Sequence, residues 1–95
     1  MFEELHPESG VRVRLDLKSE SAAAAEYALT LFFSAERRHH GQATVPPEGT
    51  IEIEGLIDAP AYAQAAAKAF LRQTQGSFRS AGRWPRRVLR WRAER

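Results

Sequence analysis

The feature that most constrains the fold of this chain is a strict alternation of apolar and charged residues from Val11 to Lys18. Valine and leucine occupy the odd positions, and arginine, aspartate and lysine occupy the even ones. Successive side chains of a β-strand point to opposite faces, so a period of two places every apolar residue on one face. The segment is therefore predicted to be a strand with one buried and one solvated face.

The segment from Ser19 to Gly41 decides which kind of sheet surrounds that strand. The four alanines at 22–25 favour a helix, and with a helical period the apolar residues fall on one broad side. Ser19 or Ser21 can cap the first turn, and Gly41 can end the helix after a cluster of arginine and histidine. A strand would instead explain the alternation of four large residues, which are Tyr27, Leu29, Leu31 and Phe33. We predict a helix over residues 22–38 and keep a β-hairpin over residues 24–45 as the alternative.

The rest of the chain shows three further elements. Residues 42–45 and 50–54 predict a hairpin around the turn Pro46-Pro47-Glu48-Gly49. Asp58 is the predicted cap of a helix that runs to about Gln75 and ends at Gly76. Residues 86–93 then predict a last strand, with Leu89 and Trp91 as its inward-facing pair.

The predicted element order is β-α-β-β-α-β. Two split β-α-β units in this order give the ferredoxin-like arrangement. This is an α+β fold in which a four-stranded antiparallel sheet carries two helices on one face. If residues 24–45 form a hairpin, the fold is instead a β-meander followed by a helix and a strand. Ninety-five residues correspond to a single domain over residues 1–95, with residues 1–10 expected to be a loosely ordered N-terminal tail.

Charge is distributed unevenly along the chain. Residues 1–67 carry five basic and eleven acidic groups, whereas residues 68–95 carry nine basic groups and Glu94 alone. Such asymmetry is typical of polyanion-binding ends, but it also arises when a basic end packs against an acidic start. The net charge of +2 therefore does not by itself select a partner.

Several function classes find no support in the residues. The chain has no cysteine, so thiol catalysis and thiolate metal sites are excluded, and it lacks a Gly-rich phosphate loop or a nucleophile elbow. His39 and His40 are adjacent, a spacing that turns their side chains away from a common ion. No segment predicts a membrane span or a signal peptide. We expect a cytoplasmic domain that is not an enzyme, binds no cofactor or metal and does not enter a membrane.

Charged residues on the outer face of the predicted sheet suggest self-association. Rows of arginine and glutamate can set the register between two copies of a sheet or between the domain and a protein partner. We therefore predict a homo-oligomer, or a protein-binding domain, that acts through its charged sheet face and its C-terminal edge strand. The candidate interaction surface comprises Arg12, Arg14, Glu52, Glu54, Arg86, Arg90 and Arg92.

The alternative is binding of RNA or single-stranded DNA without sequence specificity. Arginines contact phosphates regardless of sequence, and aromatic side chains beside them can stack on bases. The C-terminal strand and the loop before it supply both residue types. The candidate nucleic-acid contacts are Arg79, Arg83, Trp84 and Arg87.

Overall fold

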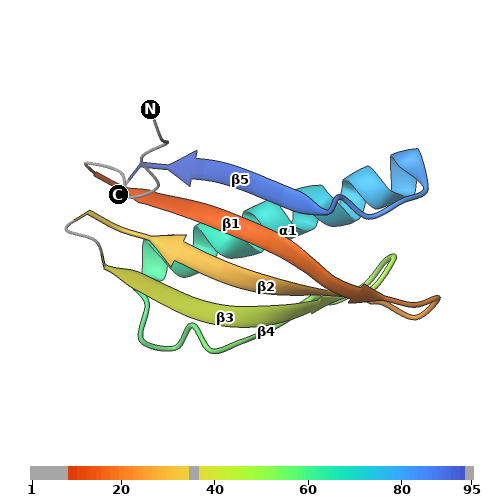
Figure 1. Cartoon of the computed structure of the whole chain (residues 1–95), viewed down its shortest axis with the longest axis horizontal. Helices are drawn as coiled ribbons and strands as arrows, with labels where there is room; N and C mark the ends of the chain where they lie inside the picture. The colour runs from red at the N-terminus through yellow and green to blue at the C-terminus, as the bar shows by residue number, and fades with distance from the viewer. Residues whose placement is uncertain (1–8, 35–36, 94–95) are drawn as a thin grey trace.

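The computed structural model describes residues 9–34 and 37–93, which form an α+β domain with one antiparallel sheet and one long helix (Figure 1). The elements in chain order are β1 (Val11–Glu20), β2 (Ala25–Phe32), β3 (Arg38–Val45), β4 (Glu52–Glu54), α1 (Ala61–Ala81) and β5 (Arg87–Arg92). The strand order across the sheet is β4-β3-β2-β1-β5. The first four strands therefore form a meander, and β5 returns to the edge beside β1.

The prediction of a ferredoxin-like fold with two helices is wrong, because the segment predicted as the first helix contains β2 and the start of β3. Antiparallel pairing sets Leu15 opposite Leu29 and Val13 opposite Leu31. All four side chains are at most 1% exposed, so the alternating apolar residues of β2 are buried on the same face of the sheet as those of β1. The alternative fold, a meander followed by a helix and a strand, is the one that the structure has.

The alanine run does not form a helix because its first three residues make the turn between β1 and β2. The Ser21 side-chain oxygen accepts hydrogen bonds from the backbone N–H groups of Ala23 and Ala24, at 3.2 and 3.4 Å. A backbone bond of 2.9 Å from the N–H of Ser21 to the carbonyl of Ala24 closes the same turn. Ser21 is thus a capping residue, as its type indicates, but it caps a hairpin turn.

The ferredoxin-like arrangement required the strand at residues 50–54 to lie beside the first strand, but it does not. Its ordered part, β4, pairs with β3, so β2 and β3 separate it from β1. Two strands therefore separate Glu52 and Glu54 from Arg12 and Arg14. The predicted hairpin between residues 42–45 and 50–54 is present, with Ala43 opposite Ile53.

The helix α1 is longer than predicted and covers one face of the sheet. It begins after Pro60, without a side-chain cap, passes through Gly76 and ends at Gly82, whose φ of 80° is left-handed. Its buried residues are Ala63, Ala66, Ala67, Phe70, Leu71 and Thr74. The small alanine side chains allow a close approach to the sheet, and Figure 1 shows α1 crossing behind the strands.

The last strand was predicted close to its true position but with the wrong face inward. β5 sets Val88 and Arg90 opposite the core residues Leu15 and Val13, whereas Trp91 lies opposite Arg12 on the other face. A shift of one residue in register reverses every side chain of a strand. The Arg92 guanidinium lies 5.2 Å from the centre of the Phe70 ring, so an arginine covers the end of the core in place of tryptophan.

The N-terminal segment preceding β1 is described only at its last two residues. The indole N–H of Trp91 donates a hydrogen bond of 2.9 Å to the carbonyl oxygen of Ser9, and Gly10 is buried beside it. Residues 1–8 of the predicted tail lie outside the described residues. In residues 9–34 and 37–93, no helix is long and apolar enough to cross a membrane.

Candidate functional site

The face of the sheet opposite α1, here called the open face, is covered by no helix or strand among those the structure describes. The pairing registers identify the side chains that share this face. They form four rows that run across the strands. In order, the rows are Trp91, Arg12, Phe32 and Arg38; Leu89, Arg14, Thr30 and His40; Arg87, Asp16, Ala28, Gln42 and Glu54; then Ser19, Glu26, Thr44 and Glu52.

The first two rows form the basic half of the open face, defined here as Arg12, Arg14, Arg38 and His40 together with Phe32 and Trp91. The guanidinium groups of Arg14 and Arg38 lie 5.2 and 5.6 Å from the centre of the Phe32 ring. Both distances are in the range of cation–π attraction. Phe32 is 1% exposed, so it acts as a support that holds two arginines in place rather than as a stacking surface.

Asp16 lies next to this half and binds two of the arginines on the face. Its carboxylate accepts hydrogen bonds from Arg14 Nε at 2.9 Å and from Arg87 Nε at 2.7 Å. The side chains of Arg14 and Asp16 are about a quarter exposed, whereas that of Arg87 is 68% exposed. One carboxylate between two guanidinium groups leaves a net positive charge at this point.

The last two rows contain the acidic half, defined here as Glu26, Glu52 and Glu54. All three side chains are exposed, and they surround a shallow depression of about 210 Å³ whose floor includes Thr44 and Gln42. The Ser19 hydroxyl donates a weak hydrogen bond of 3.4 Å to Glu26. Like charges on neighbouring strands repel one another, so positively charged side chains of another molecule would stabilise this half.

A second and larger depression, of about 690 Å³, lies beside the basic half where β1 meets the start of β5. Its floor is made of the small residues Ala28 and Thr30. Positively charged or titratable groups on its rim are Arg14, Lys18, His40, Arg86 and Arg87, and Asp16 is its one carboxylate. Several arginines around a small-residue floor can bind an anionic group such as a phosphate.

The structure divides the predicted interaction surface between four places. Arg12 and Arg14 lie in the basic half, and Glu52 and Glu54 lie in the acidic half. Arg90 and Arg92, by contrast, share the helix-covered side of β5 with Val88. Arg86 precedes β5 and lines the basic depression.

The predicted nucleic-acid contacts also separate. Trp84 is 6% exposed and stacks on Phe78 with ring centres 4.2 Å apart, so its indole face is taken. Arg79 and Arg83 are exposed near the C-terminal end of α1. Arg87 lies on the open face, where it pairs with Asp16.

The site residues that sequence reasoning missed are Asp16, Lys18, Glu26, Phe32, Arg38, His40 and Trp91. Four of them, Glu26, Phe32, Arg38 and His40, belong to the segment from Ser19 to Gly41 that was interpreted as helical. The signal that could have found them is the alternation in residues 25–45, because a hairpin reading places Glu26, Arg38 and His40 on the face opposite Tyr27. Trp91 was missed because its strand was assigned the opposite face.

The described residues contain no group of three or more His, Asp or Glu side chains placed to hold a metal ion. The chain also matches no protein-family model, no curated protein and no solved structure. The chemistry of the open face is therefore the basis for inferring a function.

Proposed function

We propose that this domain acts by self-association through its open face. The single observation that supports the proposal is the division of that face into a basic half and an acidic half along the strand direction. A two-fold axis running across the strands would place the basic half of one copy over the acidic half of the other. The same contact would then form twice, so that each half of each copy is neutralised once.

Residues near the two ends of the face illustrate the match. Arg38 lies in the first row and Glu26 in the last, on neighbouring strands. In the proposed dimer Arg38 of each copy faces Glu26 of the other. Trp91, 49% exposed and in the first row, adds an aromatic side chain of the kind that anchors protein interfaces.

The free edges of the sheet offer less favourable routes to a dimer. Two copies of β4 joined edge to edge would bring Glu52 and Glu54 close to their own counterparts. Two copies of β5 would do the same with Arg87, Arg90 and Arg92. Like charges opposite one another destabilise strand pairing, and charged edges are a common protection against it. The proposal therefore places the interface on the open face, to which β5 contributes, and not on the free edge of β5.

The size of the face indicates how tight this dimer is. Five strands about 4.8 Å apart, with about six residues each at ~3.3 Å, present roughly 500 Å². Stable complexes bury about 800 Å² per partner, so we expect a dissociation constant on the order of micromolar. Because much of the attraction is between exposed charges, we also expect dimerisation to weaken as salt is raised.

A charge exchange tests the proposal. Glu26→Arg and Arg38→Glu should each weaken the homodimer by roughly ten- to a hundredfold, because two attractive contacts become repulsive in each variant. An equimolar mixture of the two variants should recover a dimer, since each arginine pair of one variant then faces a glutamate pair of the other. Sedimentation velocity from ~1 to 300 μM measures all three samples. A wild-type chain that stays monomeric throughout this range would refute the proposal.

The basic depression favours a second candidate, binding of single-stranded nucleic acid without sequence specificity. Arg14, Lys18 and Arg87 lie on its rim and can contact successive phosphates. Asp16 competes for two of these arginines, so Asp16→Asn should strengthen binding several-fold. Fluorescence anisotropy with a labelled 20-nucleotide oligothymidine at ~50 mM salt measures this affinity.

One variant separates the two candidates. Glu26→Arg removes a negative charge from the open face and adds a positive one, so it should weaken self-association but strengthen oligonucleotide binding. Lys18→Glu is the converse control for the second candidate and should weaken the oligonucleotide complex. No binding of the oligonucleotide by the wild-type chain at ~50 mM salt would exclude this second function.

A further inference from the structure

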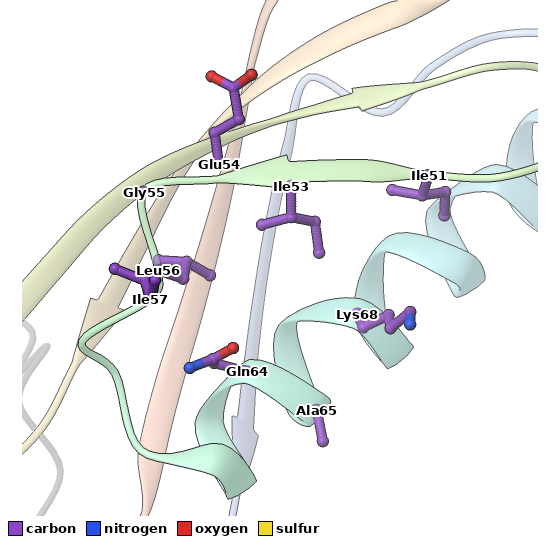
Figure 2. A pocket seen from close by; sticks show the side chains of 9 residues that line it. All are labelled: Ile51, Ile53, Glu54, Gly55, Leu56, Ile57, Gln64, Ala65 and Lys68. Carbon is purple, nitrogen blue, oxygen red and sulfur yellow. The ribbon is translucent and has the colours of Figure 1, made fainter.

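A groove separate from the open face lies between β4 and α1, with a volume of about 870 Å³ (Figure 2). Ile51 and Ile53 line it from the β4 side, Leu56 and Ile57 from the connection to α1, and Gln64 and Lys68 from the helix. Figure 2 shows Ile53 directed toward the helix and Glu54 directed to the other side of the strand. The groove is thus on the helix-covered side of the sheet.

The groove lies where α1 covers the sheet incompletely. The backbone of α1 comes close to β1 and β5, and the side of the core beneath β4 is left partly open. Ile51 and Ile53 are accordingly only half-buried, and Ile57 is 87% exposed. Ile57 and Trp91 are the two large apolar side chains that are exposed among the described residues. An exposed isoleucine on the rim of an apolar groove is typical of a binding site.

The backbone beside the groove is also incompletely paired. β4 is the last strand of the sheet on this side, and β3 is the strand that pairs with it. A strand at an edge presents a row of N–H and C=O groups that another extended segment can pair with. The apolar groove and the free edge of β4 therefore lie side by side.

The charges on β4 specify what kind of segment would fit. A strand added to β4 would turn alternate side chains toward the groove and toward the open face. On the groove side they would meet Ile51, Ile53 and Ile57. On the other side they would meet Glu52 and Glu54, both exposed and without an ion pair among the described residues.

We propose that the edge of β4 binds an extended segment of a partner protein, by strand addition, in which apolar residues alternate with lysine or arginine. A second copy of β4 does not fit, because it would bring glutamates opposite glutamates. The groove lies on the other side of the sheet from the proposed dimer face, and the two sites share Glu52 and Glu54.

Titration of the wild-type chain with synthetic peptides tests this inference. The probe is a nine-residue peptide of alternating valine and lysine, and the control peptide has the same composition with the valines and lysines in two blocks. We expect the alternating peptide to bind at least tenfold more tightly in isothermal titration calorimetry. We also expect the amide protons of β4 to exchange more slowly in the complex, which is the signature of strand pairing. Equal affinity for both peptides, or no slowing of exchange in β4, would overturn the proposal.

Two variants identify the contacts. Ile57→Glu should reduce the affinity for the alternating peptide at least tenfold, while leaving the dimer of the open face unchanged because Ile57 is not on that face. The double variant Glu52→Lys and Glu54→Lys should lose affinity for the valine–lysine peptide and gain it for a valine–glutamate peptide of the same pattern. If Ile57→Glu instead abolishes self-association, the groove belongs to a second copy of the chain and the proposed partner is wrong.

Discussion

The hydroxyl of Tyr27 donates a hydrogen bond of 2.6 Å to the carbonyl oxygen of Pro85. This bond joins the middle of the sheet to the segment that connects α1 with β5, 58 residues further along the chain. Tyr27 is 0% exposed, and its ring meets the edge of Trp84 with centres 6.4 Å apart. The return of the chain to the edge of β1 is thus fixed from inside the core.

Tyr27→Phe should reduce the free energy of unfolding by about 1–2 kcal/mol, because it leaves the partly buried Pro85 carbonyl without this hydrogen-bond donor. Urea unfolding monitored by circular dichroism measures the change. A difference from wild type below ~0.3 kcal/mol would mean that the bond does not contribute to stability.

The same residue predicts how stability depends on alkaline pH. Burial, with a smaller contribution from the negative charge of Glu20, raises the pKa of Tyr27 from 10.0 to about 12. The unfolded chain therefore releases this proton at lower pH than the folded one, so folding is unaffected by Tyr27 below pH ~10 and is destabilised as the pH rises from 10 to 12. Unfolding midpoints measured from pH 9 to 12 should fall more steeply for wild type than for Tyr27→Phe. Parallel curves would contradict this assignment.

Gly76 offers a stabilising substitution. It lies inside α1, and a Cβ built there has no atom within 4 Å. Gly76→Ala should therefore raise the free energy of unfolding by about 0.5–1 kcal/mol through the higher helix propensity of alanine. The matched control is Gly82→Ala, which should destabilise by about 1 kcal/mol because Gly82 has a φ of 80°. Thermal unfolding of both variants measures the two changes in stability. Stability changes of the same sign in both variants would contradict the prediction.

Gly41 should tolerate no side chain. A Cβ at this position would lie 2.5 Å from the carbonyl oxygen of Glu54 and 2.9 Å from a methyl group of Leu56. Gly41→Ala must push the segment that follows β4 away from β3. We therefore expect the free energy of unfolding to fall by roughly 2 kcal/mol or more. Urea unfolding compared with Gly76→Ala, an alanine substitution without a clash, isolates the steric effect. A loss below 0.5 kcal/mol would show that the segment moves freely.

Local patterns predicted several elements correctly for clear physical reasons. The alternation at residues 11–18 is unambiguous because only a strand places four apolar residues on one face with every second position charged. Residues 61–75 were likewise predicted within α1, since alanines with Phe70 and Leu71 form a single helical stripe. The hairpin over residues 42–45 and 50–54 was predicted from a turn between two short alternating segments, and in the structure it sets Ala43 opposite Ile53.

The candidate site was only partly predictable, because its composition depends on which face each strand presents. Arg12 and Arg14 were placed correctly from their own strand. Glu26, Arg38 and His40 could not be found while their segment was interpreted as a helix. The faces of Trp91 and Arg92 follow from the register of β5 on β1, which sets Trp91 opposite Arg12 and leaves Arg92 beside Phe70, a residue 22 positions earlier in the chain.

By itself the sequence determined that this protein is an α+β domain, with a half-buried strand near its start, an alanine-rich amphipathic helix and a basic last strand. Only the tertiary structure decided whether residues 22–38 form a helix or strands, because the local free-energy preferences for the two states are similar over one short segment. The free energy gained by burying Leu29 beside Leu15 and Leu31 beside Val13 is larger than that small difference. Once those residues became strands, the sheet gained a long open face, and its basic and acidic halves came from residues scattered over all five strands.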